Sequence, residues 1–304
     1  MFGAAAAPDA EAMIEATGLT KRLGGRTVVS DVSFRCEPGT VTGFLGPNGA
    51  GKTTTMRMLV GLSDPEAGAS RVLDRPYREL ENPGRRVGVL LDASAQHPGR
   101  TGREALTVSA LMMGVDTSRV DELLQLVGLD KSAAKKRVRQ YSLGMRQRLG
   151  LANALLGDPE VLILDEPANG LDPEGIRWMR GLLRDFADRG GTVFLSSHLL
   201  LEVEAVADRL LIIGGGRIVA DGSCEELLSG AGVLVRATDD EELAAALRAA
   251  DLDYQTVDGG FVVDASAESV GAAALRGAVI LTHLGPSEGA GLEQLFFDLT
   301  EVPA

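Results

Sequence analysis

The clearest chemistry in the sequence lies at residues 46–53, which read Gly-Pro-Asn-Gly-Ala-Gly-Lys-Thr and fit the pattern G-x-x-x-x-G-K-[ST]. Glycines let successive backbone N–H groups turn inward around an anion, and a helix that begins there adds partial positive charge. Lys52 supplies a full charge for the β- and γ-phosphates of a nucleotide, and Thr53 supplies a hydroxyl for Mg²⁺. The pattern therefore predicts a phosphate-binding site made by Gly46, Pro47, Asn48, Gly49, Ala50, Gly51, Lys52, Thr53 and Thr54.

Two carboxylates follow an apolar run at residues 161–164, where the chain continues as Asp165 and Glu166. A hard carboxylate oxygen such as that of Asp165 suits a Mg²⁺ shell, and Glu166 can polarise an attacking water. Alone this run is a weak signal, because a buried strand followed by a polar turn is common. Beside a phosphate loop, it predicts hydrolysis of a nucleoside triphosphate.

The elements that position these groups are predicted to form an α/β domain on a largely parallel sheet. Polar loops follow several of the expected strands, at the carboxyl ends where open α/β sheets bind ligands. Helical periodicity replaces the strand pattern between about residues 100 and 158, which predicts a helical insertion. The expected strands cover residues 40–45, 161–164, 192–196 and 210–213, and the expected helices cover 54–62, 104–113, 120–126 and 147–156.

A second, smaller domain is expected after a Gly-containing linker at residues 229–232. Before it, glycines 214–216 predict a hairpin, and Ser223 with Glu226 predicts a capping box that opens a short helix. The later order β-α-β-β-α-β is typical of a ferredoxin-like α+β fold. The expected elements cover residues 233–238, 241–250, 254–257, 261–264, 269–276 and 278–282, and a terminal helix is expected at 291–300. The predicted division is a flexible leader at 1–10, a nucleotide-binding domain at 11–230 with its insertion at about 93–158, and an acidic accessory domain at 231–304.

Composition excludes several classes of protein. The chain of 304 residues is 45% hydrophobic and 24% charged, which fits two folded cores and not a disordered chain. No apolar run reaches the roughly 18 to 20 residues that crossing a bilayer requires, and residues 1–15 lack the basic start of an export signal. The net charge is −13, of which residues 231–304 carry −10, so nucleic-acid binding is not expected. A short basic cluster at Lys135, Lys136, Arg137 and Arg139 is more typical of a solvated helix face than of a phosphate-binding patch.

Further segments, in order along the chain, carry a resemblance to a known family. Residues 141–147 read Tyr-Ser-Leu-Gly-Met-Arg-Gln, residues 170–172 read Gly-Leu-Asp, and His198 follows an expected strand. With the phosphate loop and the acid pair, residues 10–225 resemble an ATPase subunit of the ATP-binding cassette family. The resemblance implies a P-loop fold in which Ser142 and Gly144 contact the γ-phosphate on an opposite subunit. It also implies that Asp172 lies near that subunit and that His198 orients the water; without it, Ser142 would be an ordinary helix cap.

Two positions depart from the pattern of this family. The family usually stacks an aromatic side chain on adenine, and Leu23 stands where that residue aligns. Leucine covers the base without the aromatic contribution of about 0.5 to 1.5 kcal/mol. Asp92 stands where the family usually has a Gln that reaches the metal, and Gln96 lies four residues later. We expect Asp92 either to contact Mg²⁺ or to belong to a simple surface loop.

The sequence as a whole predicts an ATPase that binds Mg²⁺-ATP between two copies of itself, or between itself and a homologous subunit. The resemblance implies separate membrane permease subunits and a cytoplasmic location on the inner face of the membrane. The single cassette, the signature segment and the appended domain resemble the drug and antimicrobial-peptide exporter branch. A soluble cassette ATPase acting on ribosomes or DNA, and a catalytically idle partner in a heterodimer, remain alternatives. For the terminal domain, dimerisation or docking is favoured over ligand sensing.

Overall fold

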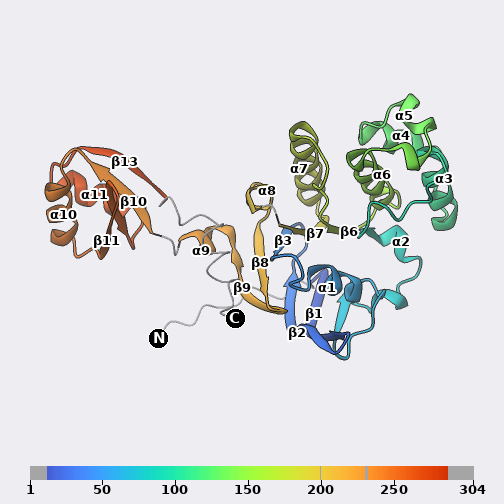
Figure 1. Cartoon of the computed structure of the whole chain (residues 1–304), viewed down its shortest axis with the longest axis horizontal. Helices are drawn as coiled ribbons and strands as arrows, with labels where there is room; N and C mark the ends of the chain where they lie inside the picture. Colours follow the sequence, from blue (N-terminus) through green and yellow to red (C-terminus); the bar gives the residue numbers. More distant parts are fainter. Residues whose placement is uncertain (1–11, 199, 230–231, 287–304) are drawn as a thin grey trace. The chain divides into compact units, whose positions relative to one another are not determined.

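The computed structural model describes residues 12–198, 200–229 and 232–286 of the chain (Figure 1). Contacts divide the chain into two compact units, Met1–Val219 and Ala220–Ala304. The division falls within the last strand of the larger sheet and about ten residues before the expected linker. Each unit has its own buried core.

The first unit is built on a six-stranded sheet whose inner strands are buried at every residue except Arg209. Neighbouring strands β5/β6, β6/β7, β7/β3 and β3/β8 pair in parallel. The parallel pairing is confirmed, and the expected strands agree with the observed ones to within one residue at each end. Across the sheet the order is β5 (Val87–Leu90), β6 (Val161–Asp165), β7 (Thr192–Ser197), β3 (Val41–Leu45), β8 (Arg209–Gly214) and β9 (Arg217–Ser223).

The predicted hairpin between β8 and β9 is present. Gly215 and Gly216 have φ angles of 56° and 82°, and a tight hairpin turn needs this left-handed region at both central positions. Short helix α9 (Cys224–Ser229) follows β9. The capping box is also confirmed, because the Glu226 amide donates to Ser223 Oγ and the Ser223 amide donates to the Glu226 carboxylate.

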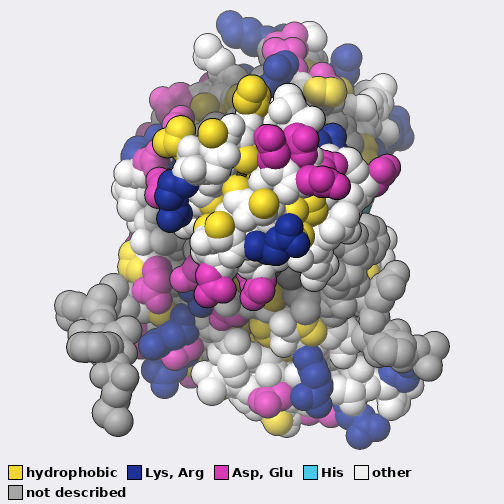
Figure 2. Space-filling model, turned by 90° about the vertical axis from the view of Figure 1, so that its left-hand side faces the viewer, with side chains coloured by type: hydrophobic (Ala, Val, Ile, Leu, Met, Phe, Trp, Pro, Cys, Tyr) yellow, Lys and Arg dark blue, Asp and Glu magenta, His cyan; other side chains and the backbone are white. Residues whose placement is uncertain are grey.

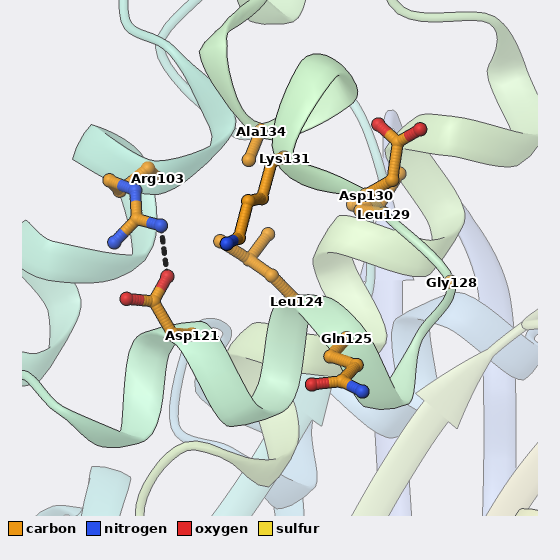
Figure 3. Close-up of a pocket in the computed structure, with 9 residues that line it drawn as sticks. All are labelled: Arg103, Asp121, Leu124, Gln125, Gly128, Leu129, Asp130, Lys131 and Ala134. Atoms are coloured by element: carbon orange, nitrogen blue, oxygen red, sulfur yellow. Dashed lines mark ion pairs between the residues drawn. The ribbon is translucent and has the colours of Figure 1, made fainter.

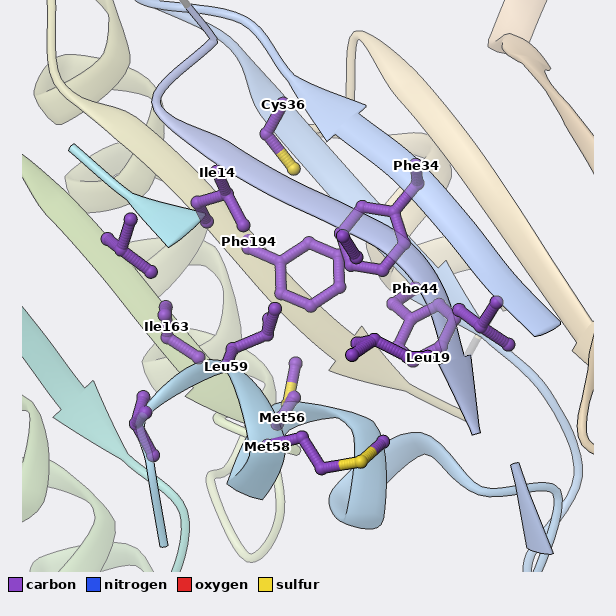
Figure 4. Packing of buried hydrophobic residues seen from close by; sticks show 14 of the residues in the cluster. Ile14, Leu19, Phe34, Cys36, Phe44, Met56, Met58, Leu59, Ile163 and Phe194 are labelled. Carbon is purple, nitrogen blue, oxygen red and sulfur yellow. The ribbon is translucent and has the colours of Figure 1, made fainter. Parts of the chain in front are cut away.

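A second sheet of three antiparallel strands was not expected from the sequence. It has the order β2 (Arg26–Cys36), β1 (Ile14–Leu23) and β4 (Ala67–Val72). Its buried side chains pack with the larger sheet and with α1 (Lys52–Leu59) into one core (Figure 4). Phe194 of β7 stacks on Phe34 of β2 and Phe44 of β3, with ring centroids 5.0 and 5.3 Å apart.

The helical insertion is formed by α3 (Gly102–Met113), α4 (Arg119–Leu126), α5 (Lys131–Lys135) and α6 (Leu143–Leu155). Thr101 and Glu104 form a capping box at the start of α3, and Gly114 ends that helix in the left-handed region. Helix α6 begins four residues earlier than periodicity predicted, because Ser142 caps it by accepting from the Met145 amide. The remaining helices of the first unit are α2 (Pro83–Arg86), α7 (Pro173–Asp188) and α8 (Leu200–Glu204), with a 3₁₀ turn at Tyr77–Glu79 and another at Val138–Gln140.

The second unit contains the predicted β-α-β-β-α-β order. Its antiparallel sheet has the order β11 (Tyr254–Val257), β12 (Gly260–Val263), β10 (Val233–Ala237) and β13 (Leu281–Pro286), with helices α10 (Asp240–Ala249) and α11 (Ala267–Arg276). This is the strand order of a split βαβ arrangement. Strand β13 begins three residues later than predicted, because residues 277–279 bond back to the last turn of α11. The expected helix at 291–300 lies outside the described residues.

Figure 2 shows one face of the molecule, viewed from the left-hand side of Figure 1. Acidic side chains are interspersed there with hydrophobic ones. The start of α10 carries Asp239, Asp240, Glu241 and Glu242, all exposed. Leu275 and Ile280 are exposed hydrophobic residues of the same unit.

Candidate active site

The phosphate loop joins the carboxyl end of β3 to the first residue of α1, as its sequence predicted. A Cβ on Gly46 would lie 2.5 Å from the Ile213 carbonyl oxygen, so no other residue fits against β8. Gly51 has a φ of 110°, and a Cβ there would lie 2.6 Å from the Val28 carbonyl oxygen. The loop is therefore pressed between β2 and β8, while its open side faces solvent beside the start of α1.

Lys52 is 6% exposed, and its ammonium group donates to the carbonyl oxygens of Gly46 and Pro47. Its Nζ lies 3.8 Å from Glu166 Oε1. Burial lowers the pKa of Lys52, and the negative charges of Glu166 and Asp165 partly oppose that shift. A phosphate in the loop would supply a closer and more strongly charged partner for the same ammonium group.

Thr53 and Asp165 meet at the start of α1 although they are far apart in the sequence. Thr53 Oγ1 donates to Asp165 Oδ2 over 2.6 Å, and Ser196 Oγ donates to the other carboxylate oxygen. A hydroxyl and a carboxylate at this distance are hard oxygen ligands of the kind that Mg²⁺ takes together with phosphate oxygens and water. The donor set fits Mg²⁺ bound with a nucleotide, whereas no cluster of three acidic, His or Cys side chains suited to a metal occurs among the described residues.

Glu166 occupies the position after β6 with a left-handed backbone, at a φ of 50°. Its backbone N–H is held by the carbonyl oxygen of Ser196 at 3.2 Å and by Ser196 Oγ at 3.0 Å. Its carboxylate oxygen Oε2 lies 2.7 Å from His198 Nδ1. The half-buried carboxylate therefore lies between a histidine ring and the Lys52 ammonium, at the mouth of the phosphate loop.

Lys52, Thr53 and Glu166 border one cleft of about 300 Å³, and Asp165 and His198 reach it through their contacts with Thr53 and Glu166. Val28 of β2 lines it although sequence reasoning did not select this residue, because an isolated valine carries no chemical signal. Ser196 was also missed as a partner of Asp165 and Glu166; its place at the end of an expected strand was the available signal. The lining residues are Val28, Pro47, Asn48, Gly49, Gly51, Lys52, Thr53, Thr54 and Glu166.

Ser142, Gly144 and Asp172 do not line this cleft. Ser142 and Asp172 are exposed, and each caps a helix: Ser142 caps α6, and Asp172 accepts from the Gly175 amide at the start of α7. Gly144 packs against the turn that leads to Asp172, since a Cβ there would lie 2.5 Å from the Gly170 carbonyl oxygen. The segment around Ser142 and the turn before Asp172 thus contact each other, outside the lining of the phosphate cleft.

Leu23 and Asp92 also lie outside the lining of the cleft. Leu23 ends β1 and is 51% exposed. Asp92 is exposed and accepts from the Ser94 amide over 2.7 Å. It follows β5, which pairs in parallel with β6, so Asp92 and Glu166 each come two residues after the paired positions Leu90 and Leu164. Asp92 therefore emerges at the same edge of the sheet as the acid pair.

A larger cavity of about 680 Å³ lies within the helical insertion (Figure 3). Arg103 of α3 forms an ion pair with Asp121 of α4 across it, and Lys131 points into it from α5. Leu124, Leu129 and Ala134 are its apolar lining residues, and it shares no lining residue with the phosphate cleft. It lacks a glycine-rich loop, so the cleft at α1 is the candidate active site. The lining residues are Arg103, Asp121, Leu124, Gln125, Gly128, Leu129, Asp130, Lys131 and Ala134.

Comparison with known proteins gives consistent similarities. Residues 29–169 match the family model described as ABC transporter. The chain is 44% identical to an uncharacterized ABC transporter ATP-binding protein, YhcH, of Bacillus subtilis strain 168, over 68% of each chain. It is 42% identical to the bacitracin transport ATP-binding protein BcrA of Bacillus licheniformis over 69% of each chain. It is 41% identical to the Nod factor export ATP-binding protein I of Paraburkholderia xenovorans, over 72% of this chain and 73% of that protein.

Solved structures share the fold of the first unit. A structure described as the ATP binding subunit of an ABC transporter superposes with a TM-score of 0.65 at 26% identity, over 71% of this chain and 91% of that one. The dimeric ATP-binding cassette MJ0796 gives a TM-score of 0.64 at 20% identity, over 69% of this chain and 98% of that one. Both similarities are to P-loop α/β proteins.

Proposed function

This chain belongs to the ABC transporter family as an ATP-binding subunit, and from that premise we propose that it hydrolyses Mg²⁺-ATP to drive export through separate membrane subunits. The observation that carries this proposal is the grouping of Lys52, Glu166 and His198 at the mouth of the phosphate loop. A nucleotide-binding protein without hydrolysis would need only the loop. The added carboxylate and histidine form a base and its partner beside the expected γ-phosphate.

In the proposed reaction, the phosphates lie on the backbone N–H groups of residues 46–53. Lys52 exchanges its carbonyl partners for β- and γ-phosphate oxygens, which stabilises the charge that develops as the terminal bond breaks. Glu166 accepts a proton from the attacking water, and His198 holds the carboxylate and the γ-phosphate in place. Thr53 and Asp165 would hold Mg²⁺, which neutralises phosphate charge when bound. Asp92, at the same sheet edge, is proposed as a further metal contact.

The composite site requires a second subunit in this proposal. Ser142 and Gly144 do not line their own phosphate cleft, and the exposed serine and the helix start at this place suit an external anion. We therefore place the γ-phosphate of a second copy, or of a homologous subunit, against Ser142 and Gly144, with Asp172 at the same interface. The description of a similar cassette as a dimer bound to ADP and Pi supports this arrangement.

Coupling to a membrane is proposed through a partner. None of the helices among the described residues is both long and apolar enough to span a bilayer. Leu111 and Met112 on α3 are exposed, Met112 by 81%, and offer an apolar contact on the helical insertion. We propose that permease subunits dock there, between residues 92 and 113, and hold this chain at the inner face of the membrane. The names of relatives concerned with bacitracin transport and Nod factor export favour an exporter. The unit after residue 230 is proposed to serve dimerisation or docking.

The test is the variant Glu166→Gln, which keeps the shape of the side chain and removes the base. Turnover should fall by about two to three orders of magnitude, because general base catalysis contributes on that scale. Binding of Mg²⁺-ATP should persist, and the nucleotide-loaded protein should sediment as a dimer. Phosphate release and analytical ultracentrifugation measure the two effects. Glu174→Gln, which changes a glutamate in the first turn of α7, is the matched control. Turnover equal to that of the unchanged protein would remove Glu166 from this role.

A further inference from the structure

Gln147 on α6 connects the helical insertion to the candidate base. Its side chain is 4% exposed, and its amide nitrogen donates to the backbone carbonyl oxygen of Glu166 over 3.0 Å. The two residues are 19 positions apart and belong to different elements. This hydrogen bond therefore joins α6, the helix that Ser142 caps, to the backbone of Glu166, the proposed catalytic base.

The Glu166 backbone needs such support. A left-handed conformation is unfavourable for a residue with a Cβ, and such a conformation persists only where the surroundings fix it. Ser196 accepts from the N–H of Glu166, and the Glu166 carbonyl oxygen accepts from the Gln147 side chain as well as from the Asn169 amide over 3.2 Å. The direction in which the Glu166 carboxylate leaves the backbone, toward Lys52 and His198, depends on these contacts, and Gln147 is the one that comes from the helical insertion.

The amide oxygen of Gln147 contributes no hydrogen bond to the packing of the core among the described residues. This oxygen is buried and accepts no hydrogen bond in the described part of the chain. A buried acceptor without a donor destabilises the fold, typically by about 1–3 kcal/mol. The donated bond to Glu166 is therefore the only polar contact that fixes this amide among the described residues.

Near Gln147, the start of α6 is also in close contact with the segment after Glu166. The Gly170 carbonyl oxygen approaches Gly144 so closely that a side chain there would overlap it. A displacement of α6 relative to residues 166–170 would change both this contact and the bond from Gln147. The start of α6 and residues 166–170 are thus linked at two points.

We propose that Gln147 is a positioning residue that makes the catalytic geometry of one ATP site depend on occupancy of the other. This rests on the proposed function, in which the start of α6 contacts the γ-phosphate held by a second subunit. Contact with that phosphate holds α6 in one position. Through the hydrogen bond from Gln147, α6 then holds the backbone carbonyl of Glu166. The Glu166 carboxylate is thereby oriented toward the water in its own cleft. Two ATP molecules are coupled through one side-chain amide in each subunit.

The experiment compares Gln147→Met, which keeps the length of the side chain and removes the donor, with Gln147→Glu, which keeps the length and donates nothing when its carboxylate is ionised. Gln125→Met and Gln125→Glu, on the exposed face of α4, are matched controls. We expect kcat to fall about tenfold in both Gln147 variants, the loss of one well-aligned hydrogen bond. The affinity for Mg²⁺-ATP, measured by calorimetry, should stay within about twofold. The Hill coefficient for ATP hydrolysis should fall toward one.

A double variant separates positioning from general stability. If Gln147 acts through Glu166, then Gln147→Met should not further reduce the residual turnover of Glu166→Gln. A full additional loss in the double variant, a normal Hill coefficient, or a parallel loss of melting temperature and ATP affinity would overturn the proposal. If Gln147→Met fails to fold, the same measurements on Gln147→Glu decide. Absence of hydrolysis by the unchanged chain would refute the proposed function, whereas hydrolysis that ignores both Gln147 variants refutes only this coupling.

Discussion

Replacing Gly144 with alanine tests whether the start of α6 must lie directly on the turn at Gly170. The added Cβ would lie 2.5 Å from the Gly170 carbonyl oxygen and 3.7 Å from Leu171 Cα. The close neighbour is backbone, so it cannot rotate away as the end of a side chain could. To reach an ordinary contact distance, α6 and the turn must separate by about 0.5 to 1 Å.

The expected effects follow from that separation. Overpacking of this size destabilises a protein by about 1–3 kcal/mol. A displacement of about 1 Å at a catalytic site reduces turnover by about a hundredfold. We therefore expect kcat for ATP hydrolysis to fall by about that factor, measured as phosphate release at saturating Mg²⁺-ATP. Binding of ATP to an isolated subunit should be unaffected, because Gly144 does not line the phosphate cleft.

Gly181→Ala is the matched control, because a Cβ at Gly181 meets no atom within 4 Å. Gly181 lies within α7, so this variant should be more stable by about 1 kcal/mol and fully active. A Gly144→Ala variant with the turnover of the Gly181→Ala control would refute the argument that α6 and the turn act together. Loss of ATP binding by Gly144→Ala would equally refute it, since the defect would then lie in the cleft.

Three further predictions follow from the site. Leu23→Tyr should tighten ATP binding about threefold, because the exposed position leaves room for a ring to stack on the base; an unchanged dissociation constant would place the base elsewhere. Burial lowers the pKa of Lys52 below 10.5, so the folded chain without ligand binds fewer protons there than the unfolded chain. The free energy of unfolding should therefore decrease as the pH falls from 10.5 to the lowered pKa of Lys52, and increase again as the pH returns to 10.5. Urea unfolding of Lys52→Met should lack this pH dependence. An identical pH profile in the variant would contradict the prediction. Removing residues 231–304 should leave ATP affinity unchanged and weaken self-association measured by light scattering, because none of the described residues between 232 and 286 lines the cleft; loss of affinity would contradict this.

The parts of the fold that sequence predicted well are those with strong local signals. The inner strands of the large sheet are short apolar runs, and the capping box at Ser223 marks its helix by local hydrogen bonds. The strands β1 and β2 were missed because their buried residues alternate only in part, with register shifts in their pairing. Strand β13 was misplaced because the turn after α11 depends on how residues 277–279 bond to that helix.

At the site, the sequence was sufficient to identify side chains whose type indicates a chemical role. It was not sufficient to predict the contacts between side chains of different elements. The phosphate loop and the acid pair could be selected because their residue types are rare in such an order. Val28 and Ser196 have no such signature, and their roles follow from strands that meet only in the folded sheet. The hydrogen bond from Gln147 to Glu166 depends on how close α6 lies to the end of β6, and no spacing along the chain predicts that distance.

The strained backbone at Glu166 has a consequence for engineering this protein. A left-handed residue other than glycine carries a conformational penalty of about 1–3 kcal/mol, and glycine removes most of it. Selection for heat resistance alone would therefore reward Glu166→Gly, a change that discards the carboxylate. Thermostable variants obtained without an activity screen should be sequenced at this codon first, because relief of the backbone strain there leaves an inert cleft.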